Sequence, residues 1–295
     1  MKALLLAGGS ALRLYPFTRV RPKPLLPLAN ETILRRNLRS LAEAGINSVV
    51  IVHAAGDDSI RAQLGKDAGL GLHIEYVAQK GEGIGAAIAS ARDKMVHGQY
   101  FLLGYADILS TSNIYNGILG VFNRLRAPTA SVCLTDESTR HYGNVYLDGE
   151  MKITRIVEKP HERDLGNYIL CGVFTMPYQF FDLVGEAGGD ILSAFDKVIE
   201  QFGIYAAIWE HDWIDINYPW SILGANKMVM DTLQESRVAT DVKISPSVTI
   251  RGPVVIESGT QICEGASIHG PVVIGKNCFI GNNALIREYC SLGPN

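Results

Sequence analysis

This chain of 295 residues lacks the features that mark several common classes of protein. Its five cysteines are odd in number and include no C-x-x-C pair, which argues against a disulfide framework and a structural zinc site. No apolar run is long enough to span a membrane, and no Lys/Arg cluster is dense enough to bind a nucleic-acid backbone. We therefore expect reduced, mostly buried thiols and neither a membrane nor a nucleic acid as a partner.

The pattern of the first nine residues is not the one expected of a secretion signal. Residues 1–9 contain one basic residue and a short apolar run that breaks into glycine without a cleavage-type segment. A buried first strand explains this run better, so we expect a soluble, cytoplasmic protein. With 47% hydrophobic and 19% charged residues the composition is globular, and the length allows one large domain and a small one.

What the sequence does contain is a regular alternation of strand and helix patterns. From residue 2 to about 135, short apolar runs alternate with helical periods, one of them over residues 84–97. This order predicts an α/β fold with a Rossmann-like, mostly parallel sheet flanked by helices, which binds ligands beyond the carboxyl ends of its strands. Residues 143–174 contain successive strand patterns, and we interpret them as a β-rich insertion that covers one side of the cleft.

Beyond residue 236 the pattern repeats every six residues. The apolar members of the repeats are Ile244, Ile250, Ile256, Ile262, Ile268, Ile274, Ile280, Ile286 and Leu292. Neither a helix nor an ordinary strand has this period, whereas a parallel β-helix that turns a corner every six residues does. The repeats resemble the left-handed parallel β-helix of hexapeptide-repeat proteins, in about three coils. We thus expect one domain over residues 1–236 and a β-helix over residues 237–295.

The repeats still run when the chain stops at Asn295, which leaves an open coil edge. An exposed strand edge invites pairing with another chain. We expect either that the natural protein is longer or that contacts in a homo-oligomer, made through the β-helix, cover this edge.

The most informative segment directly follows the first strand. A glycine turn there brings backbone N–H groups close to a polyphosphate, and Arg13 and Lys23 on the same loop would neutralise its charge. A Gly-Gly pair after a strand is, by itself, more often a plain tight turn. The string LAGGSALRLYPFT at residues 6–18, followed by RPKPLLP at residues 21–27, resembles the pattern L-x-G-G-x-G-T-R-L-x-P-x-T followed by P-K-P-L of the sugar-1-phosphate nucleotidylyltransferases.

This resemblance covers residues 1 to about 230 and implies a catalytic domain with appended repeats, similar to long forms of glucose-1-phosphate thymidylyltransferase and UDP-sugar pyrophosphorylase. In the family the glycine loop wraps the nucleotide phosphates, and the matching residues are Leu6, Ala7, Gly8 and Gly9. Arg13 corresponds to the arginine that stabilises the departing pyrophosphate, and Lys23 to the lysine on the phosphates. Ala11 and Leu12 stand where the family usually has Gly and Thr, and the methyl group of Ala11 can force different loop dihedrals and weaken activity.

Two carboxylates are expected to hold a metal ion. Asp107 ends the strand pattern YFLLGYAD at residues 100–107, although a lone acid there is as often a cap. The family has a Gly-Asp at this point whose aspartate binds Mg²⁺, and Ala106 replaces that glycine here. Asp215, in WIDINYPW at residues 213–220, resembles the family's W-x-D-[IV]-x-x-P-W segment and is the expected partner. Mg²⁺ suits such a pair because it keeps waters and uses few carboxylates together with substrate phosphates.

Further segments resemble the family's sugar-binding and base-binding elements. Gly143 with Glu158 and Lys159 matches a Y-G and V-x-E-K-P pair that reaches the sugar and its 1-phosphate, although Glu-Lys alone would indicate a solvated turn. The next sugar-binding stretch is matched more loosely, by Asn167 and Gly172.

Gln79 and Gly85 resemble the Q-x-x-x-x-x-G-T-A loop that reads the base, with Ala86 in place of Thr. A glutamine amide donates and accepts at once, which fits the imide edge of uracil or thymine. The alternative for this segment is a mobile surface loop.

These segments together predict a metal-dependent enzyme that transfers a nucleotidyl group from an NTP, with UTP or dTTP favoured, to a hexose 1-phosphate. Two alternatives stay open. One is a bifunctional enzyme whose β-helix is an amino-sugar-phosphate acetyltransferase, with His269 as its candidate histidine. The other is a non-catalytic regulatory subunit that binds a nucleotide sugar. The base, the sugar and the oligomeric state are left open by the sequence.

Overall fold

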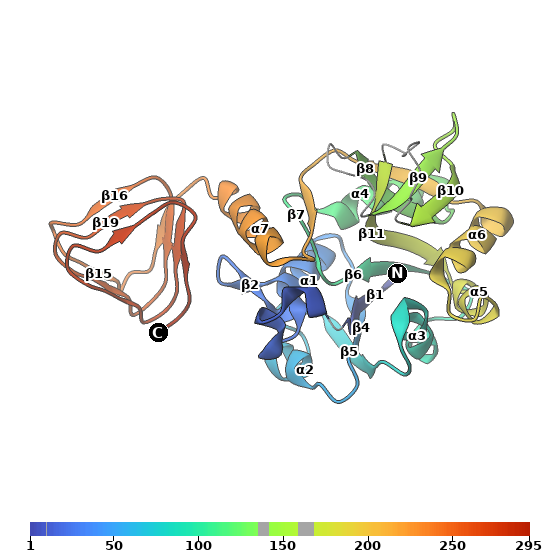
Figure 1. Ribbon diagram of the computed structural model, residues 1–295, viewed down its shortest axis with the longest axis horizontal. Coiled ribbons are helices and arrows are strands. Elements are labelled where there is room, and N and C mark those ends of the chain that lie inside the picture. The colour runs from blue at the N-terminus through green and yellow to red at the C-terminus, as the bar shows by residue number, and fades with distance from the viewer. Residues whose placement is uncertain (10, 135–141, 159–167) are drawn as a thin grey trace. The chain divides into compact units, whose positions relative to one another are not determined.

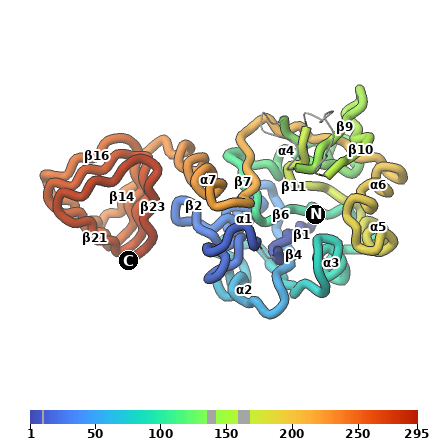
Figure 2. Tube along the Cα trace, viewed as in Figure 1, coloured from blue at the N-terminus to red at the C-terminus, as the bar shows by residue number. Residues whose placement is uncertain are grey.

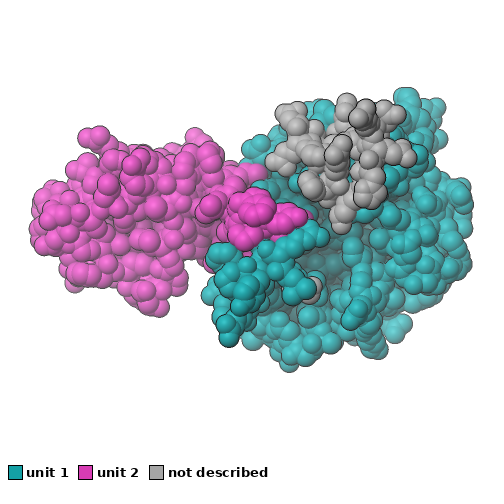
Figure 3. All heavy atoms as spheres, in the orientation of Figure 1, with its two compact units in different colours: residues 1–25, 34–215 teal, residues 26–33, 216–295 magenta. Residues whose placement is uncertain are grey.

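The computed structural model describes residues 1–9, 11–134, 142–158 and 168–295. Within them the chain forms two compact units, which Figure 3 shows in different colours. The first unit comprises Met1–Leu25 and Leu34–Asp215, and the second comprises Leu26–Ile33 and Ile216–Asn295. The domain boundary expected near residue 236 stays a prediction, since compactness divides the chain at other residues.

The first unit is an α/β fold (Figure 1). Its strands are β1 (Lys2–Ala7), β4 (Ser48–His53), β5 (His73–Ala78), β6 (Tyr100–Tyr105), β7 (Ile108–Ser110), β8 (Thr129–Leu134), β9 (Gly143–Leu147), β10 (Ile153–Glu158), β11 (Tyr168–Pro177), β12 (Tyr205–Trp209) and β13 (Trp213–Asp215). The α-helices are α1 (Ile33–Glu43), α2 (Ser59–Leu64), α3 (Gly83–Ser90), α4 (Ile114–Leu125), α5 (Phe180–Glu186) and α6 (Ile191–Phe202). Short 3₁₀ turns are η1 (Leu12–Leu14), η2 (Phe17–Arg19), η3 (Lys23–Leu25) and η4 (Arg92–Lys94).

The main sheet is mixed, with a parallel and an antiparallel part. Among the described residues its strand order is β10-β9-β11-β6-β1-β4-β5, and β8 pairs with both β11 and β12. β1 pairs in parallel with β4 and β6, whereas β11 pairs antiparallel with β6, β8 and β9. The interpretation of residues 143–174 as an insertion is therefore wrong for its last strand. β11 is a central member of the main sheet, because its register with β6 buries it between apolar layers.

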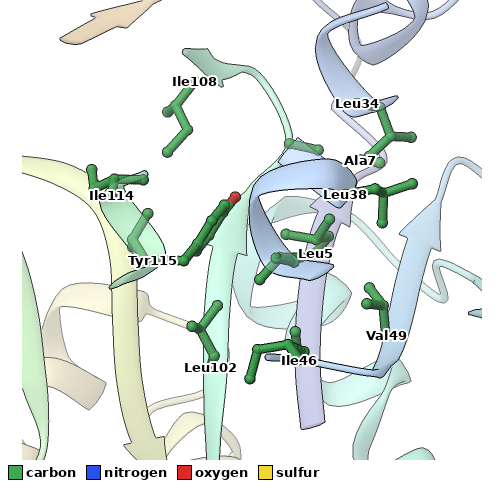
Figure 4. Packing of buried hydrophobic residues seen from close by; sticks show 14 of the residues in the cluster. Leu5, Ala7, Leu34, Leu38, Ile46, Val49, Leu102, Ile108, Ile114 and Tyr115 are labelled. Carbon is green, nitrogen blue, oxygen red and sulfur yellow. The ribbon is translucent and has the colours of Figure 1, made fainter. Parts of the chain in front are cut away.

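Apolar side chains cover both faces of this sheet. On one face α1, α2 and α4 pack against it, and Figure 4 shows Leu5, Leu38 and Tyr115 in this layer. On the other face α3, α5 and α6 pack against it, with Leu4 and Phe195 among the buried side chains. A strand that is covered on both faces has a near-continuous apolar sequence. This explains why apolar runs that alternate with helical periods predict this fold. Because helices cover both faces, a ligand can reach the sheet only at the ends of its strands.

Local side chains explain where several helices begin and end. Asn113 accepts a hydrogen bond from the backbone N–H of Asn116 and so caps α4, which is the expected pattern at a helix start. The helix expected over residues 84–97 ends earlier, at Ser90, and a 3₁₀ turn follows. The hydroxyl of Ser90 donates to the carbonyl oxygen of Ala86 at 2.7 Å, a local bond that competes with continuation of the helix.

The second unit contains a triangular parallel β-helix (Figure 2). Its strands are β14 (Arg237–Val238), β15 (Lys243–Ile244), β16 (Thr249–Arg251), β17 (Val254–Ile256), β18 (Gln261–Ile262), β19 (Ser267–His269), β20 (Val272–Ile274), β21 (Phe279–Ile280), β22 (Leu285–Ile286) and β23 (Ser291–Leu292). Residues one coil apart pair in parallel, as Val254 does with Val272. The six-residue period buries Ile256, Ile262 and Ile268 inside the coils, which confirms the predicted β-helix.

Two further elements belong to the second unit. One is the 26–33 hairpin, which comprises Leu26–Ile33 and pairs β2 (Pro27–Leu28) with β3 (Glu31–Thr32). The other is α7 (Pro219–Asp231), which has proline at its first position, where the missing N–H would have no partner in any case.

Two expectations about the whole chain concern its cysteines and its relation to membranes. All five cysteines are free thiols, and all but Cys290 are buried, in line with the expected reduced and mostly buried thiols. None of the helices in the described part of the chain has the length and apolar character needed to cross a membrane. The cytoplasmic location and the homo-oligomer stay predictions.

Candidate active site

A cavity of about 700 Å³ lies where the carboxyl ends of β1, β4, β5 and β6 come together. This is the position expected for a ligand of such a sheet, and the volume is typical of small-molecule sites. The predicted site residues that line it are Leu6, Gly8, Gly9, Gln79, Asp107 and Asp215. Segments far apart in the sequence thus supply one concave surface.

Gly8 and Gln79 form one wall of the cavity. A Cβ atom on Gly8 would lie 2.5 Å from Oε1 of Gln79, so a larger residue would require this amide to move. Nε2 of Gln79 donates to the carbonyl oxygens of Gly81 and Gly83, at 3.1 Å each. These bonds brace the loop before α3 and hold the amide oxygen over the glycine turn.

The ammonium group of Lys23 brings together the two aspartates predicted to bind a metal. Its Nζ lies 2.7 Å from Oδ2 of Asp107 and 3.6 Å from Oδ1 of Asp215, and the lysine side chain is 7% exposed. Asp107 follows β6, and Asp215 ends β13. β13 pairs antiparallel with β7, and this register places Asp215 opposite Ile108. The two carboxylates therefore lie on neighbouring segments and face one cation.

Tyr105, the last residue of β6, borders the cavity close to these acids. Loss of hydration raises the pKa of its hydroxyl, and the negative charges of Asp107, Glu158 and Asp215 raise that pKa further. The phenol therefore stays protonated and can donate a hydrogen bond. Gly172 makes room for this ring: its φ is 78°, and a Cβ atom there would lie 2.8 Å from Cδ2 of Tyr105.

The residues that resemble a sugar site lie on β9, β10 and β11. Gly143 is the register partner of Glu158, and a Cβ atom on Gly143 would lie 3.0 Å from the carboxylate oxygen Oε2 of that glutamate. Nε1 of Trp213 donates to the carbonyl oxygen of Cys171 at 3.0 Å, which joins β13 to β11 beside Gly172. Lys159 and Asn167, the two other predicted sugar residues, lie outside the described residues.

Three other predicted residues are placed differently from those at the cavity wall. A Cβ atom on Gly85 would collide with the carbonyl oxygen of Gly189, so this glycine permits close packing of α3 against the chain before α6. Arg13 is exposed on η1, and Ala7 is buried at the end of β1. None of the three is among the described residues that line the cavity. Their roles in nucleotide binding stay predictions.

Ala11 keeps a backbone conformation that is typical of glycine. Its φ is 46° and its ψ is 38°, in the left-handed region, so the methyl group has not forced different dihedrals on this residue. Such a conformation costs a non-glycine residue roughly 1–2 kcal/mol. Leu12, the next departure from the resembling pattern, is 78% exposed. Ala86 packs under the loop, with its Cβ 3.3 Å from where a Cβ atom on Gly81 would lie.

Ala54, Ala55 and Tyr105 also line the cavity but carry no recognisable sequence signal. The two alanines directly follow β4, and small apolar side chains have no chemistry from which a role can be inferred. An aromatic residue at the end of an apolar strand is typical of a core. The one signal that could have indicated these three residues is their position at the end of a buried strand or directly after it, at the ligand-binding edge of the sheet.

The acid pair suits a hard divalent cation. The part of the chain that the structure describes contains no group of three or more His, Cys, Asp or Glu side chains able to hold a metal by themselves. Carboxylate oxygen is the donor that Mg²⁺ prefers, and Mg²⁺ commonly uses one or two carboxylates with substrate phosphates and water. The carboxylates of Asp107 and Asp215 therefore fit Mg²⁺ only if substrate phosphates and water complete its coordination.

Comparison with known families decides the class. Residues 2–232 match the nucleotidyl transferase family over almost the whole α/β fold and α7. The chain belongs to the nucleotidyl transferase family. Residues 253–288 match the bacterial transferase hexapeptide family, described as six repeats. The predicted enzyme class and the hexapeptide repeats are thereby confirmed.

This nucleotidyl transferase is similar to named proteins along nearly its whole length. It is 29% identical to a bifunctional sugar-1-phosphate nucleotidylyltransferase/acetyltransferase of Sulfurisphaera tokodaii, over 99% of this chain and 71% of that protein. It is 28% identical to mannose-1-phosphate guanylyltransferase 1 of Arabidopsis thaliana, over 95% of this chain and 78% of that protein. The structure of UDP-glucose pyrophosphorylase from Acinetobacter baumannii shares the fold, with a TM-score of 0.67 at 19% identity over 76% of this chain and 91% of that one.

Replacement of Ala11 with glycine is expected to raise the free energy of unfolding by roughly 0.5–1 kcal/mol. The glycine relieves left-handed strain, and its larger entropy in the unfolded chain offsets part of the gain. Chemical denaturation measures the change. The matched control is Ala62→Gly in the exposed part of α2, which should lower the free energy of unfolding by about 1 kcal/mol. Equal destabilisation by both substitutions would contradict the left-handed backbone at Ala11.

Proposed function

We propose that this enzyme transfers a nucleotidyl group from a nucleoside triphosphate to a sugar 1-phosphate. The proposal rests on the contacts of Lys23 with Asp107 and Asp215. These two acids line the cavity together with the glycine turn. Backbone N–H groups and a lysine suit phosphate oxygens, and an acid pair suits the cation that accompanies a triphosphate. The relatives named as sugar-1-phosphate nucleotidylyltransferase and mannose-1-phosphate guanylyltransferase support the same class of reaction.

In the proposed reaction an oxygen of the sugar 1-phosphate attacks the α-phosphorus of the triphosphate in line. A new P–O bond forms, the bond to the β-phosphate breaks, and pyrophosphate leaves with the electron pair. No protein nucleophile takes part, so catalysis depends on positioning and on neutralisation of charge. We assign the amides of the glycine turn and Lys23 to the phosphates, and Arg13 to the departing pyrophosphate.

We assign Asp107 and Asp215 to one Mg²⁺ ion. When bound, this ion would neutralise phosphate oxygens at the reacting centre. Both carboxylates already lie within 3.6 Å of one ammonium group, so their separation suits a shared cation. Lys23 is held by the same acids, which keeps its ammonium group beside the point where we place the phosphates.

We assign the base to the cavity wall that contains Gln79, and the sugar to a separate group of residues. The oxygen of Gln79 lies over the glycine turn, where it can accept a hydrogen bond from the imide N–H of uracil or thymine. This supports UTP or dTTP as the nucleotide, with Gly85 shaping the loop. For the hexose 1-phosphate we propose Gly143, Glu158, Lys159, Asn167 and Gly172.

Asp107→Asn and Asp215→Asn are each expected to abolish turnover, with kcat/KM lower by more than about 100-fold. Each substitution removes a charged oxygen from a direct metal ligand, and even groups behind such ligands contribute 10–100-fold. Pyrophosphate release from a panel of NTPs and sugar 1-phosphates with Mg²⁺ measures the effect. Asp182→Asn is the control, because this exposed carboxylate pairs with Arg92 on the surface and its loss should leave turnover unchanged.

The same panel decides between the competing assignments. Near-normal turnover of either variant with Mg²⁺ would remove the metal assignment. Faster turnover with GTP than with UTP or dTTP would overturn the assignment of the base. If the unmodified protein binds nucleotide sugar but releases no pyrophosphate with any pair, the non-catalytic alternative is correct.

A second candidate function, acyl transfer by the β-helix, is favoured by one cluster on its surface. Oγ of Ser267 lies 3.1 Å from Nε2 of His269, and Nδ1 of the same ring lies 3.8 Å from Oε1 of Glu288. A histidine placed between a hydroxyl and a carboxylate can accept a proton from an attacking amine or hydroxyl. We therefore propose acetyl transfer to an amino-sugar phosphate as a second activity, and the bifunctional relative supports it.

His269→Gln is expected to abolish acetyl-CoA consumption and to leave pyrophosphate release unchanged. Glutamine keeps hydrogen-bonding capacity but cannot accept the proton at neutral pH. Release of the CoA thiol in the presence of an amino-sugar phosphate measures the first activity, and the pyrophosphate assay measures the second. A lack of acetyl-CoA consumption by the unmodified protein would exclude this function for the chain.

A further inference from the structure

Asn226 of α7 joins two segments that are distant in sequence. Its Oδ1 accepts a hydrogen bond from the backbone N–H of Ala29 in the 26–33 hairpin, at 3.0 Å. Its Nδ2 donates to the carbonyl oxygen of Tyr289, also at 3.0 Å. Tyr289 belongs to the last coil of the β-helix, which comprises β21, β22 and β23. One side-chain amide therefore connects the helix, the hairpin and the coil.

Asn30 makes a second connection between the hairpin and the same coil. Its Nδ2 donates to the carbonyl oxygen of Leu292 at 2.6 Å, and its Oδ1 accepts from Oγ of Ser291 at 3.0 Å. Asn30 has a φ of 64°, a left-handed conformation that asparagine tolerates better than most residues. The tip of the hairpin is thus bonded to β23 through both ends of one amide.

α7 is bonded to the last coil by Tyr289 as well. The hydroxyl of Tyr289 donates to Oδ1 of Asp231 at 2.8 Å, and Nζ of Lys227 lies 4.7 Å from the centre of its ring. Polar contacts of this kind fix a geometry more than they add stability, because each depends on direction and distance. The hairpin, α7 and the last coil therefore form one defined arrangement within the second unit.

The chain leaves this arrangement directly at the proposed nucleotide site. Lys23 stands three residues before Leu26, the first residue of the hairpin segment, and Asp215 immediately precedes Ile216, where the rest of the second unit begins. The link from Lys23 is short and stiff: it is the 3₁₀ turn η3, and the proline at its second position has a fixed φ. The hairpin and the segment that leads into α7 are thus covalently close to Lys23 and to Asp215, respectively.

We propose that Asn30 and Asn226 are positioning residues for nucleotide binding, and that the last coil of the β-helix acts through them on Lys23 and Asp215. This inference rests on the proposed function. Lys23 and Asp215 lie 3.6 Å apart, and displacements near 1 Å at such sites can cost up to about 100-fold in rate. The β-helix is then a structural part of nucleotide binding.

Asn30→Gly in the full-length protein tests the proposal. Glycine adopts a φ of 64° without strain, so the hairpin keeps its backbone while both bonds to β23 are lost. The KM for the Mg–NTP complex is expected to rise about 10-fold, and the KM for the sugar 1-phosphate to stay unchanged. Calorimetry of NTP binding in Mg²⁺ should show the same loss of affinity.

Asn226→Asp is a second variant that does not depend on the hairpin backbone. It keeps an acceptor for the N–H of Ala29 but places a second oxygen against the carbonyl oxygen of Tyr289. The same selective rise in the nucleotide KM is expected. The control is Ser247→Ala, which removes a bond between two coils, from the N–H of Gly265, and touches neither hairpin nor α7. It should lower the melting temperature without changing either KM.

The outcomes separate this inference from the proposed function. If the unmodified protein turns over NTP and sugar phosphate but both asparagine variants keep its nucleotide KM, the inference is wrong and the function stands. Equal changes in both KM values, or the same change in Ser247→Ala, would show a general loss of stability and also overturn it. If the unmodified protein neither binds nor turns over any NTP, the proposed function fails and the inference fails with it.

Discussion

The ammonium group of Lys23 and the two carboxylates that face it constrain much of the α/β unit. A buried ammonium ion without partners would cost several kcal/mol, so the lysine requires nearby acids. Asp107 and Asp215 meet this need at 2.7 and 3.6 Å, although 108 residues of sequence separate them. The loop after the glycine turn, the end of β6 and the end of β13 must therefore converge. That convergence places both acids and the glycine turn around one cavity, with the lysine side chain against the acids.

The shape of the cavity follows from several close approaches of backbone and side chain. Gly8 lies under the amide of Gln79, which would have to move to admit a methyl group, and Gly172 lies against the ring of Tyr105. Ala11 shows the opposite case, since a residue with a methyl group keeps the left-handed backbone and bears the strain. Strain of this kind persists only where the surrounding structure determines the conformation. The backbone of the loop after β1 is therefore held by its surroundings more than by the conformational preference of Ala11.

The β-helix makes two different sets of polar side-chain contacts. One set is the outward cluster of Ser267, His269 and Glu288, to which we assign the proposed acetyl transfer. Its last coil is instead bonded to the 26–33 hairpin and to α7 through Asn30, Asn226 and Tyr289. A repeat structure buries its interior with a simple period and leaves its outer side chains free for specific contacts. The same coils can thus present an outward cluster of polar side chains and also make specific contacts to the hairpin and to α7.

The sequence by itself determined the features that depend on local order. The six-residue period predicts the β-helix because each repeat buries its own apolar residue, and strand-then-glycine patterns predict which loops border the cavity. Only the tertiary structure decided that β11 pairs with β6, that Gly85 packs against Gly189, and that the 26–33 hairpin joins the second unit. Tyr105 likewise became visible as a cavity residue only in the fold. These outcomes depend on contacts between residues far apart in the chain, and no local pattern encodes which distant partner a segment meets.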